Sequence, residues 1–326
     1  MRGLSLLVML ALGALSADPA TAASGKLVLY TSQPNEDAQA TVDAFNQQYP
    51  DVEVEWIRDG TTKVMAKLRA EQAAGAPQAD VLLIADTVTM EALKQEGLLL
   101  AYPEAATDAY PAGLHDPDGH YFSTKLITTG IVYNNDAPMK PTSWHDLVAA
   151  DAKDLVTMPS PLTSGAATIH IAALTANPEF GWSYIEQLAA NGVVPQGGNG
   201  ATFKAVAQGE KLYGMVIDYL PIREAAKGSP VTFVFPKEGV SAVTEPVAIL
   251  STTSNPEAAK AFVDFLLSKE GQELAASQGY LPALPEVAPP PGFPPRDEIV
   301  LMDFDPATAL ANEKADKDRF VELFGE

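Results

Sequence analysis

The segment 160–166 (SPLTSGA) contains the densest group of residues that could bind a ligand. It precedes a predicted helix, whose first backbone N–H groups have no partner within the helix and, together with the helix dipole, favour an anion. Its glycine would let a ligand approach the backbone closely. An ordinary helix N-cap explains the same hydroxyl groups, so both interpretations stay open. The candidate ligand-binding residues here are Ser160, Thr163, Ser164, Gly165 and Ala166.

Further polar side chains follow predicted strands at residues 26–30, 80–84 and 213–217. In open α/β sheets a ligand lies beyond the carboxyl ends of the strands, which makes these positions candidates. A carboxylate there could pair with a ligand ammonium group, and a tyrosine could donate a hydrogen bond or offer its ring face to a cation. Each aspartate could equally cap a helix. The candidates are Thr31, Ser32, Gln33, Asp86, Thr87, Asp218 and Tyr219, with Asn199 as a second anion-facing cap ahead of a helix at 202–208.

No catalytic or metal-binding motif accompanies these residues. The segment 115–120 (HDPDGH) brings two histidines close to two aspartates, but the spacing matches no defined zinc motif and is typical of a surface turn. His170 lies in an apolar predicted helix and is expected to be a packed side chain. The GxSxG, HExxH, P-loop and GxGxxG patterns are all absent from the sequence. We therefore expect a protein that is not an enzyme and that holds no metal and no cofactor.

Composition excludes several other classes of protein. The chain has 326 residues, 42 acidic and 21 basic side chains and a formal net charge of −21. This balance argues against a nucleic-acid partner, which needs clustered Lys and Arg, and against an anionic membrane surface. The absence of cysteine from the sequence excludes disulfides, thiolate metal sites and lipid anchors on cysteine. The length suggests two domains or one large one.

The first 22 residues resemble a secretory signal peptide. Arg2 precedes an apolar run at 4–15, and Ala20-Thr21-Ala22 is a small-x-small cleavage site. The run is too short to span a bilayer, which disfavours the alternative of a membrane anchor. We therefore expect a protein that is secreted to the periplasm, is not lipid-anchored and is a monomer.

The candidate residues lie between strands and helices that alternate along the chain. Strands at 26–30, 52–57 and 80–84 alternate with helices at 36–48, 63–72 and 89–95, which predicts a mainly parallel sheet with helices on both faces. A second set of strands is expected at 128–133, 154–158, 192–194, 213–217, 231–235 and 247–250, separated by helices. Asn255 and Pro256 begin a long helix. A proline-rich connector follows at 289–295, and a last helix at 306–324.

Five segments of this pattern resemble a known family. They are ADVLLIAD at 79–86, PTSWHDLV at 141–148, MPSPLTSGAA at 158–167, GNGATFKAVAQGEKLYGMVIDY at 198–219 and SNPEAAKAFVDFLLSKEGQELAASQGYLPALPEV at 254–287. In this order they are similar to the extracytoplasmic solute-binding proteins of ABC importers, in the branch that binds ferric ion or 2-aminoethylphosphonate. The resemblance covers most of the chain after the signal peptide.

The resemblance implies a periplasmic binding protein type II fold of class α/β. Each of two lobes is then a mixed sheet flanked by helices, two crossover strands form the hinge, and the ligand lies in the cleft. The implied division is residues 1–22 as signal peptide, 23–128 with 247–290 as lobe 1, 129–246 as lobe 2, and 291–326 as a connector and a C-terminal helix packed on the lobes. The implied partners are a small zwitterionic or anionic ligand and an ABC permease in the inner membrane.

The ligand within this branch is judged from the residues that match the family's iron ligands. Ferric-binding members use a histidine in the first loop, a glutamate after the third strand and two adjacent tyrosines, whereas this sequence has Gln33-Pro34, Ala85-Asp86 and Tyr219-Leu220. One phenol and a doubtful carboxylate make a poor ferric site. The expected ligand is therefore a small organophosphonate, with 2-aminoethylphosphonate first. A ferric ion or a phosphorylated small molecule is the alternative.

Overall fold

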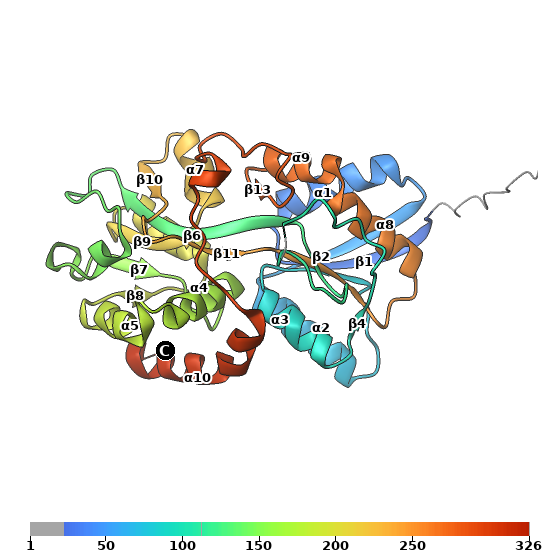
Figure 1. The fold of residues 1–326 in the computed structure, drawn as a ribbon, viewed down its shortest axis with the longest axis horizontal. Helices are drawn as coiled ribbons and strands as arrows, with labels where there is room; N and C mark the ends of the chain where they lie inside the picture. Colours follow the sequence, from blue (N-terminus) through green and yellow to red (C-terminus); the bar gives the residue numbers. More distant parts are fainter. Residues whose placement is uncertain (1–22, 112, 326) are drawn as a thin grey trace, which may run out of the picture.

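The computed structural model describes residues 23–111 and 113–325, which form two lobes side by side (Figure 1). The predicted signal peptide, residues 1–22, lies outside the described residues. Within the described ranges no helix combines the length and the apolar character needed to cross a membrane.

The first lobe is built on a six-stranded sheet in the order β2-β1-β3-β12-β4, with β5 beside β12. Strands β1, β2 and β3 are parallel, as the sequence predicted, but β12 runs antiparallel to β3, β4 and β5, so the sheet is mixed. The strands are β1 (Gly25–Thr31), β2 (Val52–Arg58), β3 (Val81–Leu83), β4 (Leu99–Leu100), β5 (Phe122–Ser123) and β12 (Pro246–Leu250). The helices are α1 (Asn35–Gln48), α2 (Thr61–Ala73), α3 (Thr87–Gln95), α8 (Pro256–Leu267) and α9 (Lys269–Ser277).

Helices cover both faces of this sheet because alternate residues of its strands are apolar on opposite sides. Leu27 and Leu29 of β1 pack in one core cluster with Phe45 of α1 and Phe262 of α8. Tyr30, the next residue, packs on the opposite face in a second cluster, which includes Leu68 of α2, Leu82 of β3 and Met90 of α3. Burial on both faces explains why β1 and β3 read as continuous apolar runs.

The second lobe is built on a seven-stranded sheet in the order β10-β6-β9-β7-β8, with β11 and β13 also paired to β6. Its strands are β6 (Lys125–Asn134), β7 (Val156–Met158), β8 (Val194–Pro195), β9 (Tyr213–Ile217), β10 (Val231–Val234), β11 (Ser241–Val243) and β13 (Leu281–Pro282). Its helices are α4 (Gly165–Ala176), α5 (Gly181–Ala190), α6 (Asn199–Ala207) and α7 (Tyr219–Ala226), with 3₁₀ turns at Trp144–Val148, Ala150–Ala152 and Arg296–Glu298. The predicted strand at 192–194 was misplaced, because Gly192 has a φ of 75° and the strand begins at Val194.

The chain crosses between the sheets at two neighbouring places. Phe122–Ser123 pairs in the first sheet and Ile127 already pairs in the second, while Val243 pairs in the second and Pro246 in the first. The crossing segments bond to each other, since the backbone N–H of Thr124 donates to the carbonyl of Thr244 at 3.2 Å. The exact lobe boundaries remain a prediction.

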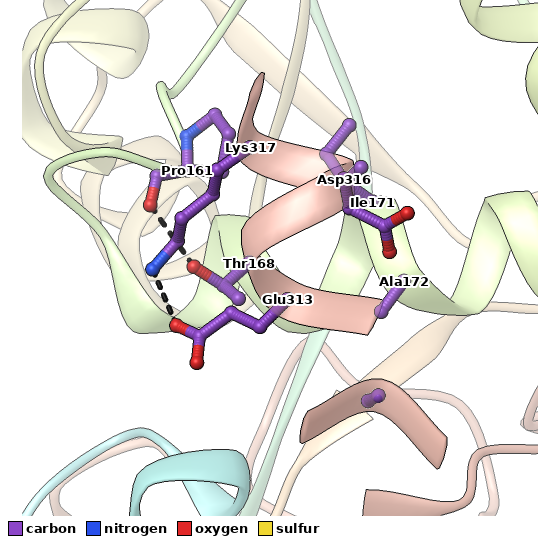
Figure 2. Close-up of a pocket in the computed structure, with 8 residues that line it drawn as sticks. Pro161, Thr168, Ile171, Ala172, Glu313, Asp316 and Lys317 are labelled. Carbon is purple, nitrogen blue, oxygen red and sulfur yellow. Dashed lines mark hydrogen bonds and ion pairs between the residues drawn. The ribbon is translucent and has the colours of Figure 1, made fainter. Parts of the chain in front are cut away.

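A C-terminal helix, α10 (Pro306–Phe324), contacts α3 in the first lobe and α4 and α5 in the second. It begins at Asp305, whose carboxylate accepts from the N–H of Thr308 at 3.1 Å. Figure 2 shows its contact with α4, where Lys317 pairs with Glu313 on α10 itself and Thr168 donates to the carbonyl of Pro161 at 3.0 Å. The space left between the two helices is about 10 Å³, which holds at most one water.

Candidate functional site

A cavity of about 430 Å³ lies between the two lobes, within the size range of small-molecule sites. From the first lobe and the hinge it is lined by Ser32, Pro34, Glu36, Arg58, Gly60, Thr61, Ala85, Ile127 and Glu245. From the second lobe it is lined by Thr163, Ser164, Gly165, Ala166, Gly198, Asn199, Gly200, Ile217, Tyr219, Leu220, Arg223, Glu224 and Lys227. We call this cavity the cleft.

Five helices begin at the walls of the cleft: α1 and α2 from the first lobe, and α4, α6 and α7 from the second. The caps of α1, α2 and α6 are Pro34, Gly60 and Gly198, and no side chain of these residues bonds to the helix it precedes. Their first N–H groups are therefore left for another acceptor. Because each helix start also carries a partial positive charge, the walls of the cleft favour an anion from both sides.

The start of α4 shows how the predicted hydroxyl-rich loop is used. The Oγ of Ser164 accepts from the N–H of Ala167 at 3.3 Å, so Ser164 is the N-cap. Asn199 holds this cap in place, because its Nδ2 donates to Ser164 Oγ at 3.1 Å and its Oδ1 accepts from Ile217 N at 3.1 Å. The loop can cap α4 and still favour an anion. The backbone N–H groups of Gly165 and Ala166 precede the first hydrogen bond within the helix, so they have no acceptor in it.

Gly165 has a different use from the one expected from the sequence. A Cβ atom there would lie 2.6 Å from the carbonyl oxygen of Ala85 and 2.8 Å from the Cβ of Asp86. The missing side chain thus allows α4 of the second lobe to approach the end of β3 in the first lobe. The glycine lines the cleft, but the close approach that requires it is between the lobes.

Seven of the thirteen candidate residues line the cleft: Ser32, Thr163, Ser164, Gly165, Ala166, Asn199 and Tyr219. Three others lie beneath it and build its loops. Thr31 Oγ1 accepts from Gln33 N at 3.1 Å, the carbonyl of Gln33 accepts from Arg58 Nε at 2.7 Å, and Ser160 Oγ accepts from Leu162 N at 3.2 Å. All three are almost completely buried.

Asp86 and Thr87 are not among the residues that line the cleft, although both were expected to face the ligand. Asp86 caps α3, with its carboxylate 3.1 Å from Thr89 N and 2.5 Å from Thr89 Oγ1. Burial raises the pKa of Asp86, and the two bonds from Thr89 oppose that shift. Thr87 lines a separate cavity behind the hinge, where its hydroxyl lies 3.3 Å from that of Thr244.

Asp218 likewise does not reach the cleft. Its side chain is fully buried, and it accepts from Thr128 N at 2.9 Å, Thr128 Oγ1 at 2.7 Å and Tyr219 N at 2.6 Å. Burial raises the pKa of Asp218 to about 7, although the bonds from Thr128 lower it. These contacts fasten the start of α7 to β6, so the carboxylate is not available to a ligand ammonium group.

The charged residues of the cleft were not among the residues predicted from the sequence. Arg58 is the last residue of β2 and directly follows the strand predicted at 52–57. The expectation that ligands lie beyond the carboxyl ends of strands would therefore have identified it. Arg223 lies one helical turn after Tyr219 on α7, and Lys227 is the C-cap residue one turn further on, so all three lie on the same side of this helix. The carboxylates that do line the cleft are Glu36, Glu224 and Glu245.

The phenol groups near the cleft are poorly suited to bind a metal. The rings of Tyr219 and Tyr280 are 4.5 Å apart, but Tyr280 donates its hydroxyl to Asp37 at 2.5 Å. Burial raises the pKa of both phenols, which disfavours phenolate. The turn at 115–120 brings together three possible metal ligands, Asp116, Asp118 and His120. The ammonium of Lys94 already lies among them, 2.5 Å from the carboxylate of Asp116.

The chain is similar in sequence to known bacterial proteins. The sequence profile of a family described as bacterial extracellular solute-binding protein matches residues 40–299. An uncharacterized protein of Haemophilus influenzae is 28% identical over 324 residues, 92% of this chain and 91% of that protein. A probable ABC transporter periplasmic-binding protein of Sinorhizobium fredii is 27% identical over 278 residues, 80% of this chain and 72% of that protein.

Solved structures with the same fold include binders of different ligands. The periplasmic binding protein AfuA of Actinobacillus pleuropneumoniae, solved with fructose-6-phosphate, is 26% identical with a TM-score of 0.81, and the match covers 92% of this chain and 98% of AfuA. Iron-bound HitA of Pseudomonas aeruginosa is 22% identical with a TM-score of 0.79, over 90% of this chain and 99% of HitA. The similarity to HitA shows only that the two proteins share a fold.

Proposed function

This chain belongs to the family of bacterial extracellular solute-binding proteins, and we propose that it captures a small organic phosphonate or phosphate in the periplasm for an ABC importer. The family role is transport, which agrees with the expectation that the protein is not an enzyme. Support for the importer comes from the similar Sinorhizobium fredii protein, named as a probable ABC transporter periplasmic-binding protein. The inner-membrane permease and a monomeric state belong to this proposal.

Five helices begin at the cleft, three of them without a side-chain cap, and this is the observation that supports the proposed ligand class. A tetrahedral phosphoryl group offers three acceptor oxygens, which suits N–H groups arriving from several directions. Arg58 and Arg223 add planar, permanently charged donors from opposite lobes. AfuA, which was solved with a sugar phosphate, supports the same class of ligand.

The other end of the ligand would meet the acidic part of the cleft. Glu36 lines the cleft and makes no ion pair with any described residue, whereas Glu224 already pairs with Lys227 at 2.9 Å. A ligand ammonium group would therefore pair with Glu36 rather than with Asp86 or Asp218. 2-Aminoethylphosphonate has both ends, so it remains the first compound to test. Iron ranks second, because the phenol that would complete the pair, Tyr280, is bonded to Asp37.

Titration calorimetry of the purified protein tests this proposal. We expect saturable binding of 2-aminoethylphosphonate and at least tenfold weaker binding of ethylphosphonate, which lacks the amine. Glu36→Gln should remove most of that difference, and Arg58→Gln should weaken both ligands about equally. Arg69→Gln is the matched control, because Arg69 pairs with Glu96 outside the cleft.

Two results would contradict the proposal. One is the absence of heat with 2-aminoethylphosphonate, ethylphosphonate and fructose 6-phosphate alike. The other is a visible charge-transfer band on addition of ferric citrate that Tyr219→Phe abolishes, which would assign the cleft to iron instead.

A further inference from the structure

Arg223 makes a contact between the lobes that ligand binding alone does not explain. It lies on α7 of the second lobe, and its Nη1 is 3.1 Å from the carboxylate of Asp37 on α1 of the first lobe. The guanidinium carbon is 4.6 Å from the ring centres of both Tyr219 and Tyr280. Tyr219 belongs to α7, and Tyr280 lies between the end of α9 and β13, which pairs with β6. The side chain is thus held between a ring of α7 and a ring at the junction of the two lobes.

Gly279 gives this arginine the space that it occupies. A Cβ atom at position 279 would lie 2.9 Å from Arg223 Nε and 3.3 Å from its Cγ. The φ angle of Gly279 is also 82°, in the left-handed region that other residues rarely adopt. A side chain there would displace the arginine from the surface of the first lobe.

The partner carboxylate is itself fixed in place. Asp37 is almost buried and accepts the hydroxyl of Tyr280 at 2.5 Å in addition to the arginine. The side chain of Gln278 donates to the carbonyl of Asp37 at 3.0 Å, so α1 and the turn after α9 present one rigid surface. Asp37 does not line the cleft, so changing it removes no side chain from the walls that a ligand would touch.

The bonding of Arg223 is incomplete. Its Nε and Nη2 are buried and have no acceptor among the described residues, although the side chain lines the cleft. A buried donor without an acceptor is destabilising. The contact with Asp37 therefore leaves hydrogen-bonding capacity that an anion in the cleft could use.

We propose that Arg223, Asp37, Tyr280 and Gly279 form a clasp that holds the lobes together and sets how far the ligand-free protein populates the closed state. Opening the cleft must separate Arg223 from Asp37 and from the ring of Tyr280. A ligand that binds only the closed form is bound more tightly when that form is already populated. This proposal rests on the proposed function in one respect only, namely that an anionic ligand in the cleft would strengthen the clasp.

Distance measurements between spin labels on the two lobes test the clasp. The sequence has no native cysteine, so Gln47→Cys on α1 and Gln208→Cys beyond α6, both exposed, place one label on each lobe. In the ligand-free protein, Asp37→Asn and Gly279→Ala should each move the distribution of distances toward longer values. The apparent affinity for 2-aminoethylphosphonate should fall about three- to tenfold in both.

Gly97→Ala is the matched control for Gly279→Ala. Gly97 follows the last residues of α3 as Gly279 follows those of α9, and its φ is 72°, but a Cβ atom there would meet nothing within 4 Å. It should leave the distances unchanged. Folding of each variant is checked by circular dichroism.

Unchanged distances in folded Asp37→Asn and in folded Gly279→Ala would overturn the clasp. If Gly279→Ala does not fold, Asp37→Asn decides alone. Because the distances are measured without ligand, this result does not depend on the identity of the ligand. Absence of binding of 2-aminoethylphosphonate, ethylphosphonate and fructose 6-phosphate alike, together with lengthened distances, would reject the proposed function and leave the clasp in place.

Discussion

Asp86 and Asp218 each follow a buried strand, and each carboxylate is taken up by nearby backbone. The carboxylate of Asp86 accepts the backbone N–H of Thr89 at the start of α3. The carboxylate of Asp218 joins the start of α7 to Thr128 on β6. The sequence pattern for such a residue is the same whether the carboxylate faces a ligand or its own chain. Only the direction of the side chain separates these possibilities, and that direction depends on how the neighbouring strand is placed.

The buried carboxyl group of Asp218 should make stability depend on pH. Its pKa in the folded protein is about 7, above the value of about 3.9 in an unfolded chain, so the folded state binds this proton more tightly. Its contribution is therefore fully present below about pH 4 and is lost as pH rises to about 7. Asp218→Asn removes this dependence.

Urea unfolding at several pH values measures the effect. Relative to Asp218→Asn, the free energy of unfolding of the wild type should fall between pH 5 and pH 7, with a slope of at most about 1.4 kcal/mol per pH unit. Asp303→Asn, at an exposed position, is the control and should show no such difference. Parallel curves for the wild type and Asp218→Asn would mean that Asp218 is ionised throughout.

Among the elements, long helices with distinct caps were predicted best. The helix at 306–324 was predicted with the bounds that the structure shows, because Asp305 and Pro306 mark its start and Gly325 its end. The two-residue strands β4, β5 and β13 were missed, since two residues have no periodicity and form only because a partner strand is adjacent. Helix α9 was not predicted as a separate element, and in the structure Ser268 caps it.

Phe320 should be the main anchor of α10. It is fully buried in the core cluster of the second lobe and packs on Phe324 with ring centres 4.5 Å apart. Phe320→Ala is expected to lower the free energy of unfolding by about 3–5 kcal/mol. Lys314→Ala, exposed on the same helix, should change it by less than about 0.5 kcal/mol. Equal effects in thermal or urea unfolding would show that α10 does not depend on this side chain.

At the scale of the whole molecule, the two crossover segments meet in a buried ion pair. The ammonium of Lys125 is 2.6 Å from the carboxylate of Glu245 and 4.0 Å from the ring centre of Tyr280. Burial raises the pKa of Glu245, and Lys125 opposes that shift. Glu245 also has a φ of 35°, an uncommon value for a residue other than glycine. Charge and backbone conformation thus both mark the hinge.

Removing one partner of this pair should leave the other charge buried and unpaired. Lys125→Met is expected to lower the free energy of unfolding by about 3–5 kcal/mol. Adding Glu245→Gln should restore part of that loss, which a double-mutant cycle measures as coupling. The exposed pair Lys26–Glu55 is the control and should show little coupling. Additive effects at Lys125 and Glu245 would contradict a coupled hinge pair.

The sequence by itself determined the α/β class, the two series of strands and helices, the family and the loop that begins α4. Each depends on local patterns: apolar periodicity, caps and turns along a continuous stretch. Tertiary structure alone decided which side chains face the cleft. Arg58, Glu36 and Arg223 meet there from two lobes, and Asp37 meets Arg223 across 186 positions of sequence, because the chain crosses twice between the sheets.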